Sequence, residues 1–289
     1  MPKSPSHKFG QIIGNLIEAV IEPFLMKVAK EKHLYLDHQK NPRKARKGKK
    51  VAWEDTFGNV HDLDYVLEMG GTDTIMGTPI AFIEVAWRRY TKHSRNKAQE
   101  IQGAILPLAE KFQWSNPFLG VVLSGVFTEG SLEQLRSLGF HVLYFPYETI
   151  VAAFDKEAID IAFDETTPDS AFRRCVKKIE SASRRRMERI KNHLVAANKG
   201  KLDDFMTLLS QRLERMVERV IIITLYGRSN EFTTIDDAIK FLDQHRIYEG
   251  CGDFRKYEVL ITFSNGDRIE GSFKDKVKVL EFLQFIAKQ

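Results

Sequence analysis

The sequence has only two cysteines, Cys175 and Cys251, among 289 residues. They form no Cys-x-x-Cys pair and no framework, which argues against a structural zinc site and against a disulfide-stapled fold. No apolar run approaches the roughly 20 residues that a membrane-spanning helix requires. The amino-terminal segment is basic but lacks a signal-peptide core, because Glu18 and Glu22 interrupt its apolar residues. We therefore expect a cytoplasmic protein without a membrane segment.

Positive charge is concentrated in two parts of a chain that is otherwise balanced. The formal net charge is +5, from 44 Lys and Arg against 39 Asp and Glu. Residues 40–50 contain seven basic side chains and no acid, and residues 173–191 contain a second basic cluster. Such clusters indicate a polyanionic partner, and the alternative is a solvated loop and a solvated helix face. The candidates for DNA binding are Arg43, Lys44, Arg46, Lys47, Arg88, Arg89, Arg184 and Arg185.

Apolar periodicity predicts an α/β organisation for the first part of the chain. The expected helices are 9–31, 94–111 and 131–138. The expected strands are 51–57, 60–68, 79–87, 118–127 and 141–146. After an initial meander, strands and helices alternate, which predicts a mixed β-sheet core flanked by helices.

The character of the sequence changes after about residue 165, so we divide the chain into domains 1–165 and 166–289. The expected helices of the second part are 169–199, 201–226, 234–246 and 275–287. An Asn265-Gly266 turn between two strand-like segments predicts a β-hairpin at 257–273. No internal repeat is evident. This mainly helical region with its hairpin is expected to bind DNA or to dimerise.

Single carboxylates stand inside two otherwise apolar strands. Asp64 lies in the segment LDYVL, and Glu84 lies in PIAFIEVAW. Continuous apolar runs are typical of strands buried on both faces. A carboxylate buried there is costly unless a cation or several donors hold it. Two of them on neighbouring strands would make a site for a hard divalent metal ion.

These residues resemble the PD-(D/E)xK nuclease superfamily, which includes type II restriction endonucleases and many DNA-repair nucleases. The resemblance covers roughly residues 9–150 and depends on an Asp in the second strand, a Glu-x-Lys-like triplet in the third and a polar helix after it. It implies a restriction-endonuclease-like fold. It also implies Mg²⁺ as cofactor, with Mn²⁺ as a substitute, bound by Asp64, Glu84 and the backbone carbonyl of Val85.

The third position of the triplet departs from the family pattern, because Glu84-Val85-Ala86 ends in alanine where the family has lysine. Alanine neither donates a proton nor binds a metal. One explanation is that the lysine has moved to the following segment, with Lys97 preferred over Lys92. The other is that the nuclease site is degenerate and the protein only binds nucleic acid.

Three further residues are supporting candidates for the site. Asp62 lies two residues before Asp64 in the same predicted strand, so both should point to one face. Glu18 resembles an acid that many family members place near the metal, and the alternative is a surface acid. Gln99 follows Lys97 in the polar helix.

The principal candidates also have purely structural interpretations. Glu84 could be a buried acid paired to Arg88 or Arg89. Asp64 could be a strand residue that faces water, and Lys97 an exposed helix lysine.

The resemblance implies a Mg²⁺-dependent endonuclease of the type II restriction kind that hydrolyses double-stranded DNA within a restriction-modification system. Cleavage at a palindrome would favour a two-fold homodimer, which is a hypothesis at this point. Two alternatives stay open. One is a non-catalytic nucleic-acid-binding module, and the other is a structure-specific repair or recombination nuclease that cuts branched or damaged DNA.

Overall fold

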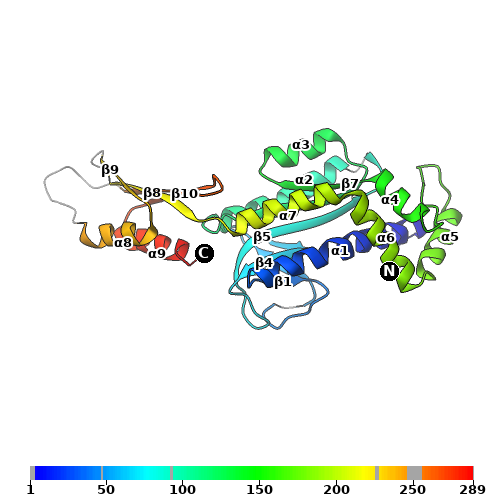
Figure 1. Cartoon of the computed structure of the whole chain (residues 1–289), viewed down its shortest axis with the longest axis horizontal. Coiled ribbons are helices and arrows are strands. Elements are labelled where there is room, and N and C mark those ends of the chain that lie inside the picture. The colour runs from blue at the N-terminus through cyan, green and yellow to red at the C-terminus, as the bar shows by residue number, and fades with distance from the viewer. Residues whose placement is uncertain (1–3, 47, 92–93, 225–227, 246–255, 289) are drawn as a thin grey trace. The chain divides into compact units, whose positions relative to one another are not determined.

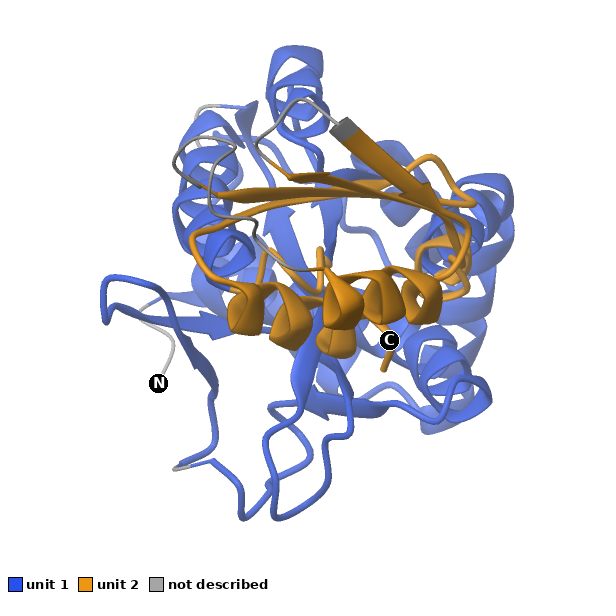
Figure 2. Cartoon of the chain, turned by 90° about the vertical axis from the view of Figure 1, so that its left-hand side faces the viewer, with its two compact units in different colours: residues 1–111, 118–209 blue, residues 112–117, 210–289 orange. Residues whose placement is uncertain are grey.

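The computed structural model describes residues 4–46, 48–91, 94–224, 228–245 and 256–288. The chain forms two compact units, residues 1–111 with 118–209 and residues 112–117 with 210–289 (Figure 2). The boundary expected at residue 165 therefore falls inside unit 1. The reason is that the helices beyond it pack on the amino-terminal helix, where Phe172 contacts Phe9 with ring centroids 5.6 Å apart.

Unit 1 contains a five-stranded mixed sheet of order β1-β4-β5-β6-β7 (Figure 1). Its strands are β1 (Tyr35–His38), β4 (Tyr65–Met69), β5 (Thr78–Arg88), β6 (Phe118–Gly125) and β7 (His141–Pro146). The β1–β4 and β4–β5 pairs are antiparallel, whereas β5, β6 and β7 are parallel. The predicted α/β fold with a mixed sheet flanked by helices is confirmed. Strand β1 was not predicted, because four residues are too few to show a period.

The strand predicted at 60–68 is interrupted at Asp64. Its first half, β3 (Val60–Leu63), pairs with β2 (Val51–Glu54) in a separate two-stranded sheet. Its second half is β4 of the main sheet. The sequence does not reveal this bend, because both halves are strands and the residues on either side of Asp64, Leu63 and Tyr65, are both buried.

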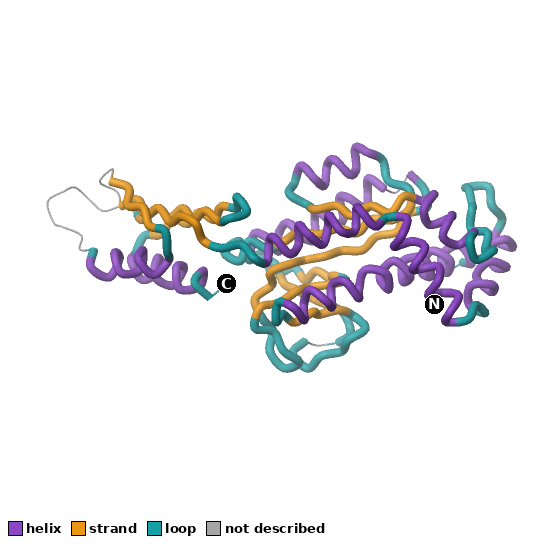
Figure 3. The backbone as a smooth tube through the Cα atoms, in the orientation of Figure 1, coloured by secondary structure: helices purple, strands orange, loops and turns teal. Residues whose placement is uncertain are grey.

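Seven helices are described in unit 1 or at its boundary (Figure 3). They are α1 (Pro5–Glu31), α2 (Ser94–Lys111), α3 (Glu129–Ser137), α4 (Tyr147–Asp155), α5 (Asp169–Glu180), α6 (Arg184–Ala197) and α7 (Lys199–Leu213). The Ser4 hydroxyl caps α1 by accepting from the His7 amide at 3.2 Å. Pro23 does not interrupt α1. No helix in the described ranges is long and apolar enough to cross a membrane.

Two of the long helices predicted after residue 165 were wrong in extent. The segment 169–199 is divided into α5 and α6, and Ser183 caps the second of them by accepting from the Arg186 amide. The segment 201–226 ends as a helix at Leu213, and Val217–Thr224 is strand β8. The β-branched run Val220-Ile221-Ile222-Ile223 favours a strand.

Unit 2 has a four-stranded antiparallel sheet of order β11-β10-β8-β9. Its further elements are β9 (Arg228–Phe232), α8 (Ile235–Gln244), β10 (Tyr257–Phe263), β11 (Arg268–Phe273) and α9 (Lys276–Ile286). The predicted hairpin is confirmed, since β10 and β11 pair from Tyr257 to Thr262.

Unit 2 also contains an internal repeat, which corrects the expectation that the chain has none. Each half is a β-hairpin followed by a helix, β8-β9-α8 and then β10-β11-α9. The central strands pair Val220 with Ile261 and Ile222 with Val259, on either side of the Ile221–Leu260 pair. If the first half is superposed on the second, Val220 falls on Val259 and Ile222 falls on Ile261, so each of these two pairs takes the place of the other. Several corresponding apolar positions carry identical residues: Val220 and Ile222 of β8 correspond to Val259 and Ile261 of β10, and Phe241-Leu242 of α8 corresponds to Phe282-Leu283 of α9.

Candidate active site

The bend between β3 and β4 places Asp64 next to β5. Strand β4 pairs with β5 from Tyr65 opposite Ile83. Continued by one residue, this register sets Asp64 opposite Glu84. Opposed residues of antiparallel strands have Cβ atoms about 4.5–5.5 Å apart. The two carboxylates that the sequence singled out therefore meet where the β4–β5 ladder ends.

The backbone of β5 holds Asp64 in this position. The Val85 N–H donates to Asp64 Oδ2 at 2.7 Å. The family resemblance implies the carbonyl of Val85 as a metal ligand, whereas the hydrogen bond from its N–H to Asp64 was not predicted. The carbonyl remains a predicted ligand, and the amide explains why Asp64 is directed at the edge of β5.

Lys97, in the first turn of α2, contacts the second carboxylate. Its Nζ lies 3.2 Å from Glu84 Oε1, and the two side chains are 17% and 15% exposed. The same ammonium lies 3.7 Å from Glu100 Oε2. Lys97 is thus a largely buried partner of Glu84 and not an exposed helix lysine.

Neither arginine near Glu84 pairs with it. Arg88 lies 3.7 Å from Glu100 and donates to the carbonyl of Trp87 at 2.9 Å. The guanidinium of Arg89 lies over the rings of Tyr90 and Phe172. The structural interpretation of Glu84 as the partner of Arg88 or Arg89 was therefore wrong.

The surroundings of the carboxylates oppose their ionisation. Burial, followed by the charge of Glu84, raises the pKa of Asp64 to about 8 despite the hydrogen bond from Val85. Burial also raises the pKa of Glu84, although Lys97 acts in the opposite direction. Glu84 Oε2 is buried and has no hydrogen-bond partner within the described ranges. A free buried acceptor beside a second carboxyl fits a hard divalent cation, which displaces protons from its ligands when it binds.

The described residues hold no complete metal cage, because no three His, Cys, Asp or Glu side chains among them are grouped to bind an ion. Asp64 and Glu84 would therefore supply two ligands. Mg²⁺ commonly uses one or two carboxylates and takes its other ligands from water and substrate phosphates. The donor set fits Mg²⁺ better than zinc, which prefers sulfur and nitrogen ligands.

The supporting candidates have different surroundings. Asp62 is 46% exposed and forms an ion pair with Lys50. Its predicted alignment with Asp64 was wrong, because the bend separates the two residues and the strand alternation does not carry across it. Gln99 is exposed on α2, and Lys92 lies outside the described residues. Glu18 lies close enough to the site for its charge to raise the pKa values of Asp64 and Glu84.

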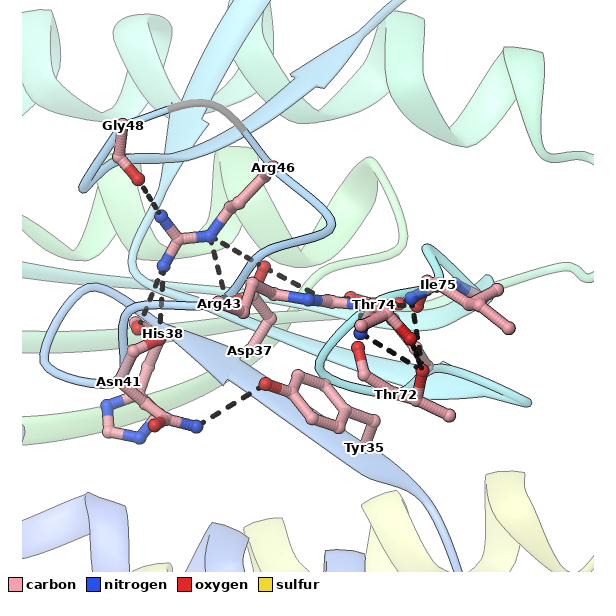
Figure 4. Close-up of polar contacts among 12 residues, drawn as sticks. Tyr35, Asp37, His38, Asn41, Arg43, Arg46, Gly48, Thr72, Thr74 and Ile75 are labelled. Carbon is pink, nitrogen blue, oxygen red and sulfur yellow. Dashed lines mark hydrogen bonds and ion pairs between the residues drawn. The ribbon is translucent and has the colours of Figure 1, made fainter.

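Arg43 and Arg46 are buried structural residues, which corrects the expectation that they bind DNA. The Arg43 side chain is 0% exposed and pairs with Asp37 at 3.3 Å and with Glu68. Arg46 Nε lies 3.0 Å from Asp37 Oδ2 (Figure 4). Asp37 and Glu68 lie in buried positions of β1 and β4 and require cations there. Glu68 directly follows three buried apolar residues of β4, and an acid in that position was the signal for a buried cation that the sequence analysis did not use.

The remaining basic candidates differ in exposure. Lys44 is 82% exposed and lies 4.0 Å from Asp73. Arg184 and Arg185 are exposed in the first turn of α6, and neither has a carboxylate of the described chain within ion-pair distance. Lys47 lies outside the described residues. Lys44, Arg184 and Arg185 therefore remain candidates for binding a polyanion.

Comparisons with known proteins do not assign a family. No protein-family model matches the chain, and no curated protein matches it. A solved structure, the "Crystal Structure of Protein of Unknown Function AF1548", aligns with 68% of this chain and 98% of its own. The identity is 9% and the TM-score is 0.27, a likeness that carries no argument.

Replacing Asp64 with Asn should stabilise the metal-free protein at alkaline pH. Because the folded-state pKa is raised, the contribution of this carboxyl is fully present below its ordinary pKa and is lost as the pH rises through about 8. Urea unfolding should give equal stabilities near pH 4 and a gain of about 2–5 kcal/mol for the variant near pH 9. Asp62→Asn, on an exposed side chain, should show no such gain. A pH-independent difference would contradict the assigned environment of Asp64.

Proposed function

We propose that this protein is a Mg²⁺-dependent deoxyribonuclease that hydrolyses phosphodiester bonds of double-stranded DNA. The observation that carries the proposal is the largely buried pair of Asp64 and Glu84, with Lys97 on one oxygen of Glu84 and, among the residues that the structure describes, no hydrogen-bond partner on the other. The resemblance to the PD-(D/E)xK superfamily supports it through the same residues. The exposed basic side chains of Lys44, Arg184 and Arg185 support a polyanionic substrate.

Each residue of the site has a role in this proposal. Asp64 and Glu84 would hold the metal ion, and the hydrogen bond from the Val85 N–H fixes the position of the Asp64 carboxylate. Mg²⁺, when bound, stabilises the negative charge that develops on the phosphate oxygens during hydrolysis. Lys97, already against Glu84, donates a hydrogen bond to the attacking water or to a phosphate oxygen. Mn²⁺ should substitute, since it accepts the same oxygen ligands.

Lys97→Met should slow Mg²⁺-dependent cleavage about 100-fold or more, because it removes the positive charge beside the reacting phosphate. Single-turnover cleavage of a plasmid measures this rate. Lys27→Met, the same change at a lysine of α1 that is 73% exposed, is the matched control and should cleave like the wild type. An unchanged rate for Lys97→Met would mean that the family lysine has no counterpart at this position.

The kind of nuclease is tested by its substrates. We propose the type II restriction kind, acting in the cytoplasm as a homodimer within a restriction-modification system. Discrete Mg²⁺-dependent bands from plasmid and phage lambda DNA support it. A smear, or cleavage of branched DNA alone, supports a repair or recombination nuclease. Gel filtration that gives a monomer both with and without duplex DNA would contradict the homodimer.

A non-catalytic nucleic-acid-binding module is the second candidate. It is favoured by Ala86, which is 3% exposed where the family has its lysine. Retained binding to DNA without cleavage of any substrate in Mg²⁺ would support this candidate. The contact between Lys97 and Glu84 favours the nuclease, because it supplies an ammonium group to the site from a neighbouring element.

A further inference from the structure

A lysine that sequence reasoning counted only as part of the basic loop lies between two acids of α1. Lys40 Nζ is 3.3 Å from Glu18 Oε2 and 3.0 Å from Glu22 Oε2. The two glutamates are four residues apart and share one face of the helix. Burial acts against the charge of Lys40, but the hydrogen bond to Glu22 and the charges of both acids raise its pKa. Lys40 is thus a cation shared by two carboxylates.

This cluster adjoins the site of Asp64 and Glu84. The hydroxyl of Tyr65, the residue after Asp64, donates to the carbonyl oxygen of Glu18 at 3.2 Å. The oxygen of the same hydroxyl lies 3.5 Å from Glu22 Oε2, one of the two carboxylates that contact Lys40. The acidic site therefore extends onto α1, where Lys40 supplies a second ammonium group besides that of Lys97.

Hydrogen bonds from the buried Arg46 side chain hold the turn that carries Lys40 in place. The backbone N–H of Asn41 donates to the backbone carbonyl of His38 at 3.0 Å. Arg46 Nη2 donates to the carbonyls of His38 and Asn41, at 3.2 and 3.4 Å, and Arg46 Nε binds the buried Asp37 (Figure 4). An exposed ion pair between two freely moving side chains contributes little. Here the lysine projects from a fixed turn onto two converging acceptors.

We propose that Lys40 is a positioning and charge-balancing residue of this site. It holds the Glu18 and Glu22 carboxylates on the part of α1 that Tyr65 contacts, and it compensates their charge, which would otherwise repel a DNA phosphate. The inference builds on the proposed DNA-cleaving function. It predicts opposite effects on two ligands. Without Lys40 the site becomes more negative, so a divalent cation binds more tightly and a DNA backbone binds more weakly.

The test is Lys40→Met, which removes the charge and keeps a long side chain. Calorimetry with Mn²⁺ on the DNA-free protein should show metal affinity raised about three- to tenfold. Fluorescence anisotropy with a short DNA duplex in EDTA should show DNA affinity lowered about three- to tenfold, with a smaller loss at high salt. Lys40→Arg should keep both wild-type values, because the cation is retained.

Two further variants separate charge balance from loss of local structure. Glu22→Gln should have the opposite effects, with weaker Mn²⁺ binding and tighter DNA binding. The double variant of Lys40→Met with Glu22→Gln should return both affinities close to wild type. Lys44→Met, on the same loop and 82% exposed, should leave Mn²⁺ binding unchanged.

The outcomes distinguish this inference from the function on which it rests. If Lys40→Met lowers the affinity for both Mn²⁺ and DNA, the role of Lys40 is structural and the inference is overturned. Unchanged affinities for both ligands would overturn it as well. If the wild-type protein itself binds no Mn²⁺, the proposed metal-dependent function fails first, before any variant is compared.

Discussion

Replacing Arg43 with alanine should lower the free energy of unfolding by about 3–5 kcal/mol. The Arg43 guanidinium is fully buried and pairs with Asp37 and Glu68. It also donates to the carbonyl oxygens of Thr72 and Ile75, which connects the loop after β1 to the loop after β4 (Figure 4). Asp37 keeps Arg46 as a second partner. Glu68, by contrast, would be left as a buried charge without a cation, and this is the main cause of the expected loss.

Urea unfolding of the purified variants measures this effect. Lys44→Ala, one residue further along and 82% exposed, should change the stability by less than about 0.5 kcal/mol. The double variant of Arg43→Met with Glu68→Met should recover much of the loss, because no unpaired charge remains buried. If the Arg43→Ala variant has the same free energy of unfolding as the Lys44→Ala variant, the buried position assigned to Arg43 is contradicted.

Replacing Glu84 with glutamine should slow Mg²⁺-dependent plasmid cleavage about a thousandfold or more. Glutamine has nearly the same shape, but it is neutral and a weaker ligand for a hard cation. The change also removes the charged partner of Lys97, which lies 3.2 Å away. Both consequences reduce the electrostatic stabilisation on which phosphodiester hydrolysis depends.

Glu100→Gln is the matched control for this variant. Glu100 also lies near Lys97, at 3.7 Å, but its side chain is 61% exposed. Its replacement should change the rate less than about threefold, since exposed ion pairs contribute little. Thermal unfolding should show that Glu84→Gln still unfolds cooperatively, so that the slower cleavage is not caused by loss of the fold. A cleavage rate within tenfold of wild type would exclude Glu84 as a metal ligand.

The sequence predicted the long periodic elements well. The helix expected over 94–111 begins and ends at those residues, and the strand expected at 79–87 is β5, Thr78–Arg88. Together these two elements bring Lys97 against Glu84, as the sequence suggested. The position of that lysine was predictable because β5 and α2 are close in the chain. Its catalytic role stays a prediction.

What the sequence did not predict depends on contacts between distant segments. The basic segment predicts that Arg43 and Arg46 bind DNA, because a run of lysines and arginines does not show that the acids Asp37 and Glu68 are buried next to it. The role of Lys40 depends on the contact between its turn and α1, and Lys40 is 18 residues away from Glu22 in the chain. Local pattern carries no information on such pairings.

The most direct test of the central claim is the return of Mg²⁺ to metal-stripped wild-type protein incubated with supercoiled plasmid DNA. If Asp64 and Glu84 form a metal-dependent nuclease site, the plasmid should stay intact in EDTA and be cut when Mg²⁺ is supplied. Cleavage that persists in EDTA would contradict the account. So would intact DNA at every Mg²⁺ and Mn²⁺ concentration, on plasmid, methylated and branched substrates alike.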